Sequence, residues 1–162
     1  MTDLRPSLNL NPNVPADAQR NPPRRRILVV DDMRLSADMV SRLLILLGQR
    51  VRTTNDAQSA LLALKEGEYD VLFSDIAMPE MNGYELAAEV RRLPERASLI
   101  LVALTGHGQA GDVRRARESG FDYHLVKPVG IDQLRDFLNE LPPLPTEAER
   151  PAPTSSPDAG SA

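Results

Sequence analysis

Residues 69–83 read YDVLFSDIAMPEMNG, an apolar run that ends in a carboxylate and is followed by turn-forming residues. A short apolar run bounded by turn signals, here residues 71–73, predicts a buried parallel strand. Pro79 and Gly83 mark the turn, and apolar residues at helical spacing follow it. Because the carboxyl ends of strands carry the chemistry in open α/β sheets, Asp75 is the first candidate for a functional residue.

The same alternation of apolar strand and amphipathic helix continues on both sides of this stretch. Strands are predicted at residues 27–30, 50–54, 71–75, 98–104 and 121–126, and helices at residues 37–47, 56–67, 83–93, 109–119 and 131–141. Right-handed crossovers between such units predict a doubly wound α/β fold, with a five-stranded parallel sheet in the flavodoxin-like order 2-1-3-4-5 and helices on both faces.

The two ends of the chain differ in composition from this middle part. Residues 1–23 are rich in Asn, Pro and Asp, and residues 142–162 in Pro, Ala and Ser, so both are predicted to be disordered tails around one domain at residues 24–141. We interpret the triplet Arg24-Arg25-Arg26 before the first strand as charged residues that keep the apolar strand from aggregating. The alternative is a docking patch for a partner.

Composition excludes several classes of function. A net charge of -4 gives no general affinity for nucleic acid or for an anionic membrane. No apolar run approaches the roughly 20 residues that span a bilayer. The absence of cysteine excludes disulfides, thiol catalysis and thiolate metal sites. These features favour a cytoplasmic protein.

Five polar side chains follow four of the predicted strands, at the point where each strand ends. They are Asp31 and Asp32 after the first strand, Asp75 at the end of the third, Thr105 after the fourth and Lys127 after the fifth. In the order 2-1-3-4-5 these four strands are neighbours, so their carboxyl ends converge at the switch point of the sheet. Taken singly, an Asp at a strand end is more often a helix cap, Thr105 would be a turn residue and Lys127 a surface lysine.

The residue types fit the transfer of a phosphoryl group. Three clustered carboxylates repel one another, and a hard divalent cation such as Mg²⁺ would neutralise them. Asp75 could then attack an electrophilic phosphorus as a nucleophile. Lys127 would supply a positive charge to the phosphoryl oxygens, and Thr105 with the glycine-rich turn after it would supply hydrogen-bond donors.

With these motifs in place, the sequence resembles a response-regulator receiver domain of bacterial two-component signalling over about residues 26–141. The resemblance implies that Asp75 is the phosphoacceptor. It also implies that Asp32, Asp75 and the backbone carbonyl of Ala77 bind Mg²⁺ directly, and that Asp31 holds it through water.

The same resemblance implies that Thr105 moves toward the phosphoryl group, that Lys127 contacts it, and that the Lys127–Pro128 peptide is cis. His124 stands where many receivers carry a switching Tyr or Phe. Together with Thr105 it forms the candidate switch pair. Either its imidazole rotates in place of the larger aromatic ring, or the surface switches in another way. His107 occupies a position that tunes phosphoryl lifetime in the family.

The expected role is that of a stand-alone signalling receiver, because no output domain follows. It would be phosphorylated by a histidine kinase or histidine phosphotransferase and would act on a downstream protein target, without catalysis beyond self-phosphorylation and autodephosphorylation. Part of the run at residues 43–47 is a candidate docking face, with core packing as the alternative. One rival is a phosphate-sink or relay receiver of a hybrid kinase. The other is a phosphoaspartyl phosphohydrolase, which would need a second Asp where Ala77 stands.

Overall fold

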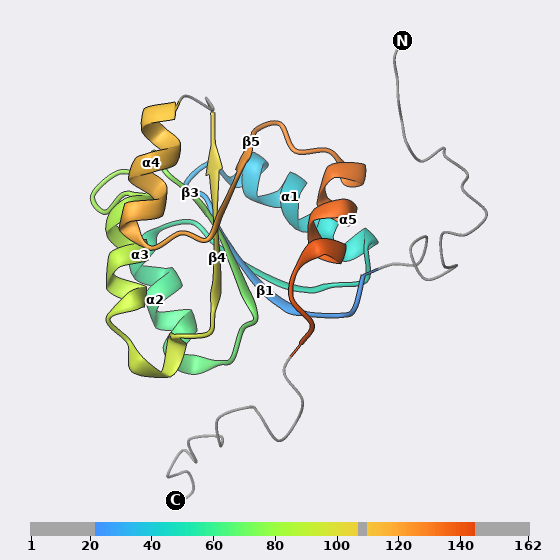
Figure 1. Cartoon of the computed structure of the whole chain (residues 1–162), viewed down its shortest axis with the longest axis horizontal. Coiled ribbons are helices and arrows are strands. Elements are labelled where there is room, and N and C mark those ends of the chain that lie inside the picture. The colour runs from blue at the N-terminus through green and yellow to red at the C-terminus, as the bar shows by residue number, and fades with distance from the viewer. Residues whose placement is uncertain (1–21, 107–109, 145–162) are drawn as a thin grey trace, which may run out of the picture.

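A computed structural model describes residues 22–106 and 110–144 (Figure 1). Of the predicted tails at residues 1–23 and 142–162, residues 1–21 and 145–162 lie outside the described residues, as does His107, whereas residues 22–23 and 142–144 are described. The described part forms one five-stranded parallel sheet in the order β2-β1-β3-β4-β5, which confirms the predicted fold. The strands are β1 (Arg26–Val30), β2 (Arg50–Thr54), β3 (Val71–Asp75), β4 (Ile100–Thr105) and β5 (Tyr123–Val126).

Helices cover both faces of the sheet. They are α1 (Arg34–Leu46), α2 (Ala57–Glu66), α3 (Gly83–Arg91), α4 (Ala110–Ser119) and α5 (Ile131–Glu140), with a short 3-10 helix at Pro94–Arg96. Figure 1 shows α1 and α5 on one face, and α2, α3 and α4 on the other. None of the helices within the described ranges is long and apolar enough to cross a membrane.

Alternation along the central strands divides the apolar core into two layers. In β1, Leu28 and Val30 pack toward α2 and α3, whereas Ile27 and Val29 pack toward α1 and α5. All five residues of β3 are buried, as expected for a strand in the middle of a doubly covered sheet. This strand therefore holds Asp75 at its end with little freedom to move.

Local signals set the ends of the helices that border the site. Asp56 accepts a hydrogen bond from the Ser59 backbone N–H at 2.7 Å and caps α2, as the sequence predicts. Asn82 and Glu85 form a reciprocal capping box that starts α3 directly after the Asp75 loop. Gly48 adopts a φ of 85°, which ends α1 and which a residue with a Cβ atom rarely adopts.

Two strands begin later than the sequence predicts, because the N–H groups of residues at their predicted starts donate hydrogen bonds within the preceding turns. Leu99 donates its N–H to the carbonyl of Arg96, so β4 begins at Ile100 and not at Ser98. Phe121 donates to the carbonyl of Ala116 and closes α4, so β5 begins two residues later. The predicted helix at residues 83–93 ends at Arg91, before the 3-10 turn that Pro94 begins.

Arg25 departs from the interpretation of residues 24–26 as exposed charged residues. Its side chain is only 3% exposed, and one guanidinium nitrogen donates to the Pro142 carbonyl at 2.7 Å. Its backbone N–H donates to the Gln49 side chain at 2.9 Å. Arg24 is exposed and Arg26 is partly exposed, so charged protection of the strand stays a prediction for these two residues. Arg25 instead connects the segment before β1 to the segment after α5.

Candidate functional site

Four strand ends bring the predicted residues into one cluster. Asp31 follows β1, Asp75 ends β3, Thr105 ends β4, and Lys127 follows β5. The carboxylates of Asp31, Asp32 and Asp75 each offer an oxygen atom within 4.8 Å of the others. The convergence that the sequence predicted for these residues is therefore present in the fold.

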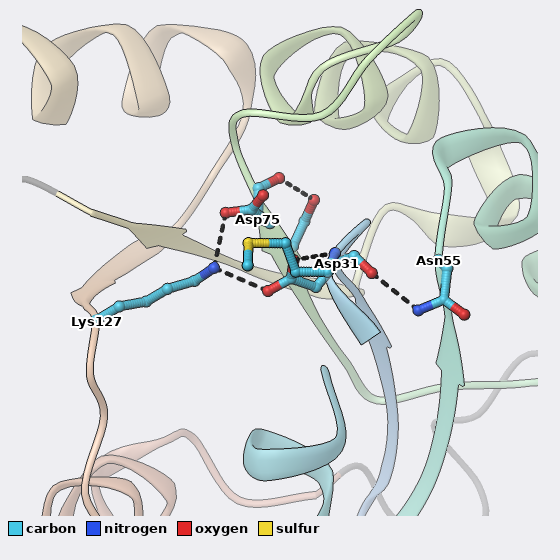
Figure 2. Close-up of polar contacts among 6 residues, drawn as sticks. Asp31, Asn55, Asp75 and Lys127 are labelled. Carbon is cyan, nitrogen blue, oxygen red and sulfur yellow. Dashed lines mark hydrogen bonds and ion pairs between the residues drawn. The ribbon is translucent and has the colours of Figure 1, made fainter. Parts of the chain in front are cut away.

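Lys127 lies between two of the three carboxylates (Figure 2). Its Nζ donates to Asp31 Oδ2 at 2.8 Å and to Asp75 Oδ1 at 3.0 Å. Asp31 is fully buried and Asp75 nearly so, whereas the Lys127 side chain is partly exposed. The Lys127–Pro128 peptide that follows is cis, as the resemblance to receivers implies.

The charges of the cluster do not balance. Burial raises the pKa of Asp75; hydrogen bonding from Lys127 opposes this shift, and the charges of Asp31 and Asp32 add to it. Burial lowers the pKa of Lys127, but its bonds to the two carboxylates outweigh this and leave that pKa raised. The single ammonium group of Lys127 thus does not balance the negative charge of ionised Asp75 and the neighbouring carboxylates. A hard divalent cation fits this set of oxygen donors and would remove the excess negative charge.

Thr105 presents an unsatisfied hydroxyl beside this cluster. Its Oγ1 is buried and has no hydrogen-bond partner among residues 22–106 and 110–144. Its backbone carbonyl accepts the Lys127 N–H at 2.7 Å, which ties the end of β4 to the segment after β5. A buried hydroxyl without a partner costs about 1–3 kcal/mol, so an oxygen ligand brought to this position would satisfy it.

The backbone around Asp75 is held by close contacts. The Ser74 hydroxyl donates to the Asp75 carbonyl at 2.8 Å. Gly83 returns to the same point, and its N–H donates to the Ile76 carbonyl at 2.9 Å. A Cβ atom on Gly83 would collide with the Asp75 carbonyl oxygen and would lie 2.8 Å from Ile76 Cα. Only glycine allows the loop to close this tightly on the end of β3.

Two further residues named from the sequence, Ala77 and His124, lie near the cluster. Ala77 is exposed two residues beyond Asp75. His124 pairs with Ala103 in the register of β4 and β5, and Thr105 pairs with Val126 two residues further along. Residues two apart on a strand point to the same face, so His124 and Thr105 share one face of the sheet. This placement agrees with a switch pair, although the role itself stays a prediction.

Asn55 is a polar residue that the sequence did not single out. Its side-chain nitrogen donates to the backbone carbonyl of Asp31 at 3.0 Å (Figure 2). The only sequence signal was its position directly after β2, which is equally typical of a turn residue. Contacts of this kind depend on how two distant segments pack, and spacing along the chain does not reveal them.

The site thus consists of a buried carboxylate, two flanking carboxylates, a lysine and a threonine at the carboxyl edge of a doubly wound sheet. A family model described as the response regulator receiver domain matches residues 27–139. The chain therefore belongs to the response regulator receiver domain family of two-component signalling.

Curated relatives include two sensor proteins. The virulence sensor protein BvgS of Bordetella pertussis is 35% identical over 150 residues, which cover 85% of this chain and 12% of that protein. The sensor histidine kinase RcsC of Escherichia coli is 36% identical over 112 residues, which cover 69% of this chain and 12% of that protein. The chain thus spans about an eighth of each sensor.

Solved structures show the same fold. The chemotaxis protein CheY4 of Vibrio cholerae is 29% identical with a TM-score of 0.68, over 72% of this chain and 97% of that one. The receiver domain of sensor histidine kinase PA1611 from Pseudomonas aeruginosa is 26% identical with a TM-score of 0.66, over 72% of this chain and 95% of that one. The PA1611 structure is described with a magnesium ion coordinated in its active site cleft.

Proposed function

We propose that this chain is a cytoplasmic signalling receiver that accepts a phosphoryl group on Asp75 from a histidine kinase or histidine phosphotransferase. Its phosphorylated form would then bind a downstream protein target. The observation that supports this most strongly is the paired contact of Lys127 with Asp31 and Asp75, next to the unsatisfied hydroxyl of Thr105. Receivers as a family work with such kinases and phosphotransfer partners.

The proposed reaction is a direct displacement at phosphorus. A carboxylate oxygen of Asp75 attacks the phosphorus of a phosphohistidine, the P–N bond breaks, and the imidazole leaves as the acyl phosphate forms. Lys127 holds the developing negative charge, and the Thr105 hydroxyl donates to a phosphoryl oxygen. Mg²⁺ would be held by Asp31, Asp32, Asp75 and the Ala77 carbonyl, and when bound it neutralises the carboxylates and the phosphoryl oxygens. Water later hydrolyses the acyl phosphate.

This function is tested with a small phosphodonor in place of the kinase. The whole chain is incubated with Mg²⁺ and acetyl phosphate, and its intact mass is measured. We expect the wild-type chain to gain a single phosphoryl group and Asp75→Asn to gain none, since an amide is not a nucleophile for phosphorus. Asp136→Asn removes an exposed carboxyl from α5 and serves as the matched control, which should be labelled like the wild type. A wild-type chain that is never labelled would refute the proposal.

The exposed face of α1 supports a protein partner beside the site. Within the run at residues 43–47, Leu44 and Leu47 are buried in the core, whereas Ile45 and Leu46 are exposed and remain available for the proposed docking face. Nearer the site, Leu35 is 78% exposed and Met39 is 60% exposed. Residues four apart lie on one side of a helix, so these two side chains form an apolar surface next to the aspartates. We propose that this surface docks on the helical bundle of the phosphodonor protein.

A double substitution separates docking from chemistry. Leu35→Gln with Met39→Gln is expected to slow transfer from a phosphorylated histidine protein by about tenfold, because two interface side chains of this size contribute on the order of 1 kcal/mol or more. Labelling by acetyl phosphate should not change, since that donor needs no docking surface. The control is Leu62→Gln, which changes a similarly exposed leucine on α2, at 56% exposure. Equal slowing by the control and the double variant would contradict this docking face.

A second role is favoured by the curated relatives. BvgS and RcsC are sensor proteins much longer than this chain, which covers 12% of each. The same site could therefore serve as a phosphate sink or relay receiver of a hybrid kinase. The intact mass of the protein purified from its native source distinguishes the roles, because this chain has a mass of 17.8 kDa and a hybrid kinase would be several times larger.

A further inference from the structure

Asn55 lies in the turn between β2 and α2 and contacts the backbone on which two of the three aspartates are carried. Its side-chain nitrogen donates to the Asp31 carbonyl at 3.0 Å. The Asp31 N–H donates in turn to the Thr54 carbonyl at 3.2 Å. Both polar groups of the Asp31 backbone are thus bonded to two consecutive residues of this turn.

The Asp31 side chain is equally constrained. One carboxylate oxygen accepts the Met33 N–H at 3.0 Å and the other accepts Lys127 Nζ at 2.8 Å. Figure 2 shows Asn55 reaching Asp31 from the side opposite to Lys127. Asp31 is fully buried between them. No backbone or carboxylate group of this residue is left to reorient freely.

The carbonyl that Asn55 holds belongs to the peptide that joins Asp31 to Asp32. This peptide is planar, so fixing its oxygen also fixes the nitrogen of Asp32. The plane also fixes the Cα atom of Asp32, from which the side chain leaves at an angle that the φ of this residue sets. Asp32 is only partly buried, and the bond from the Met33 N–H to the Asp31 carboxylate spans its backbone. The amide of Asn55 and the bond from Met33 together orient the peptide leading into Asp32, and Asn55 is the contact that comes from a distant segment.

We propose that Asn55 is a positioning residue for the divalent-cation site, acting through the Asp31–Asp32 peptide to hold the Asp32 carboxylate toward the cation. The inference rests on the proposed cation site and adds a residue that follows β2, a strand whose end carries none of the other site residues. Outer partners of metal ligands typically change metal affinity by about 10- to 100-fold when they are removed. The contact with a backbone carbonyl sets the expected effect near the lower end of this range.

The turn has other anchors, so loss of the Asn55 amide should leave the fold intact. Asp56 caps α2 through the Ser59 N–H at 2.7 Å, and the Ser59 hydroxyl donates to the second Asp56 oxygen at 2.9 Å. The bond from Asp31 to Thr54 extends the β1–β2 ladder by one step. A purely structural role for Asn55 would therefore appear as lower stability without any change in cation binding.

The test measures binding of Mg²⁺ alone by titration calorimetry, with the full chain and no phosphodonor. We expect Asn55→Ala to weaken Mg²⁺ binding about tenfold. Asn55→Gln, which keeps an amide donor, should recover part of the affinity. Ser59→Ala removes a side-chain hydrogen bond from the same turn without touching Asp31, and it should bind Mg²⁺ like the wild type. If Asn55→Ala does not fold, Asn55→Leu replaces it, because leucine fills similar space without a donor.

Two further measurements distinguish a role in positioning the cation site from a role in stability alone and from the phosphoacceptor function. The Mg²⁺ concentration that gives half-maximal labelling by acetyl phosphate should rise about tenfold in Asn55→Ala, while the rate at saturating Mg²⁺ stays unchanged. An unchanged Mg²⁺ affinity with a lower urea midpoint would overturn the proposal. If Asn55→Ala loses Mg²⁺ affinity while the wild-type chain takes no phosphoryl group, the positioning role is supported and only the phosphoacceptor function is refuted.

Discussion

Replacing Lys127 with methionine is expected to destabilise the protein by about 3 kcal/mol in the absence of Mg²⁺. Methionine keeps much of the side-chain length but removes the ammonium that donates to Asp31 and Asp75. The two carboxylates would then repel each other in a buried position with no counter-charge. The free energy of unfolding in urea measures this effect, and excess Mg²⁺ should restore much more stability in the variant than in the wild type.

The same substitution should slow labelling of Asp75 by acetyl phosphate on the order of a hundredfold, even with Mg²⁺ present. The ammonium acts on charge that develops at the phosphoryl oxygens, and loss of one such group from a buried site has an effect of this size. Lys65 on α2 is the only other lysine in the chain, and it is exposed. Lys65→Met is therefore a matched control, and equal effects from both substitutions would contradict the role given to Lys127.

Gly83→Ala is expected to be the most damaging change outside the charged residues. The added Cβ would collide with the Asp75 carbonyl oxygen and approach Ile76 Cα to 2.8 Å. Backbone atoms cannot move aside as a flexible side chain can, so the loop must shift at a cost of about 2–3 kcal/mol. Urea unfolding measures this loss of stability.

Labelling by acetyl phosphate in the same Gly83→Ala variant should fall on the order of tenfold to a hundredfold, because the displaced backbone carries the nucleophile. Gly67→Ala is the control, since a Cβ there would meet only the Tyr69 ring at ordinary distances of 3.7 Å and more. A Gly83→Ala variant with wild-type stability and wild-type labelling would show that the loop does not depend on this close approach.

Hydrophobic periodicity and turn residues were sufficient to predict the sheet order and the group of residues at its carboxyl edge. Strand ends are positions of the chain itself, so Asp75, Thr105 and Lys127 could be placed on neighbouring strands before any coordinates. The first residues of β4 and β5 could not, because hydrogen bonds within the preceding turns decide where each ladder starts.

Side chains that bond to a distant backbone were beyond the reach of sequence patterns. Asn55 reaches the Asp31 carbonyl only because β2 lies beside β1 in register. Arg25 is buried because the Pro142 carbonyl, 117 residues away in the chain, accepts its guanidinium. Residue type alone predicts an exposed position for such an arginine. The contacts that hold the site in shape thus become visible only when the segments are placed in space.

The central claim is that Asp75, and no other group in the cluster, carries the phosphoryl group. Borohydride reduction of the protein labelled with Mg²⁺ and acetyl phosphate converts an aspartyl phosphate to homoserine, which peptide mass spectrometry can locate. We expect homoserine at position 75 alone. Homoserine at Asp31 or Asp32, or a label that resists borohydride and maps to His124, would contradict the assignment.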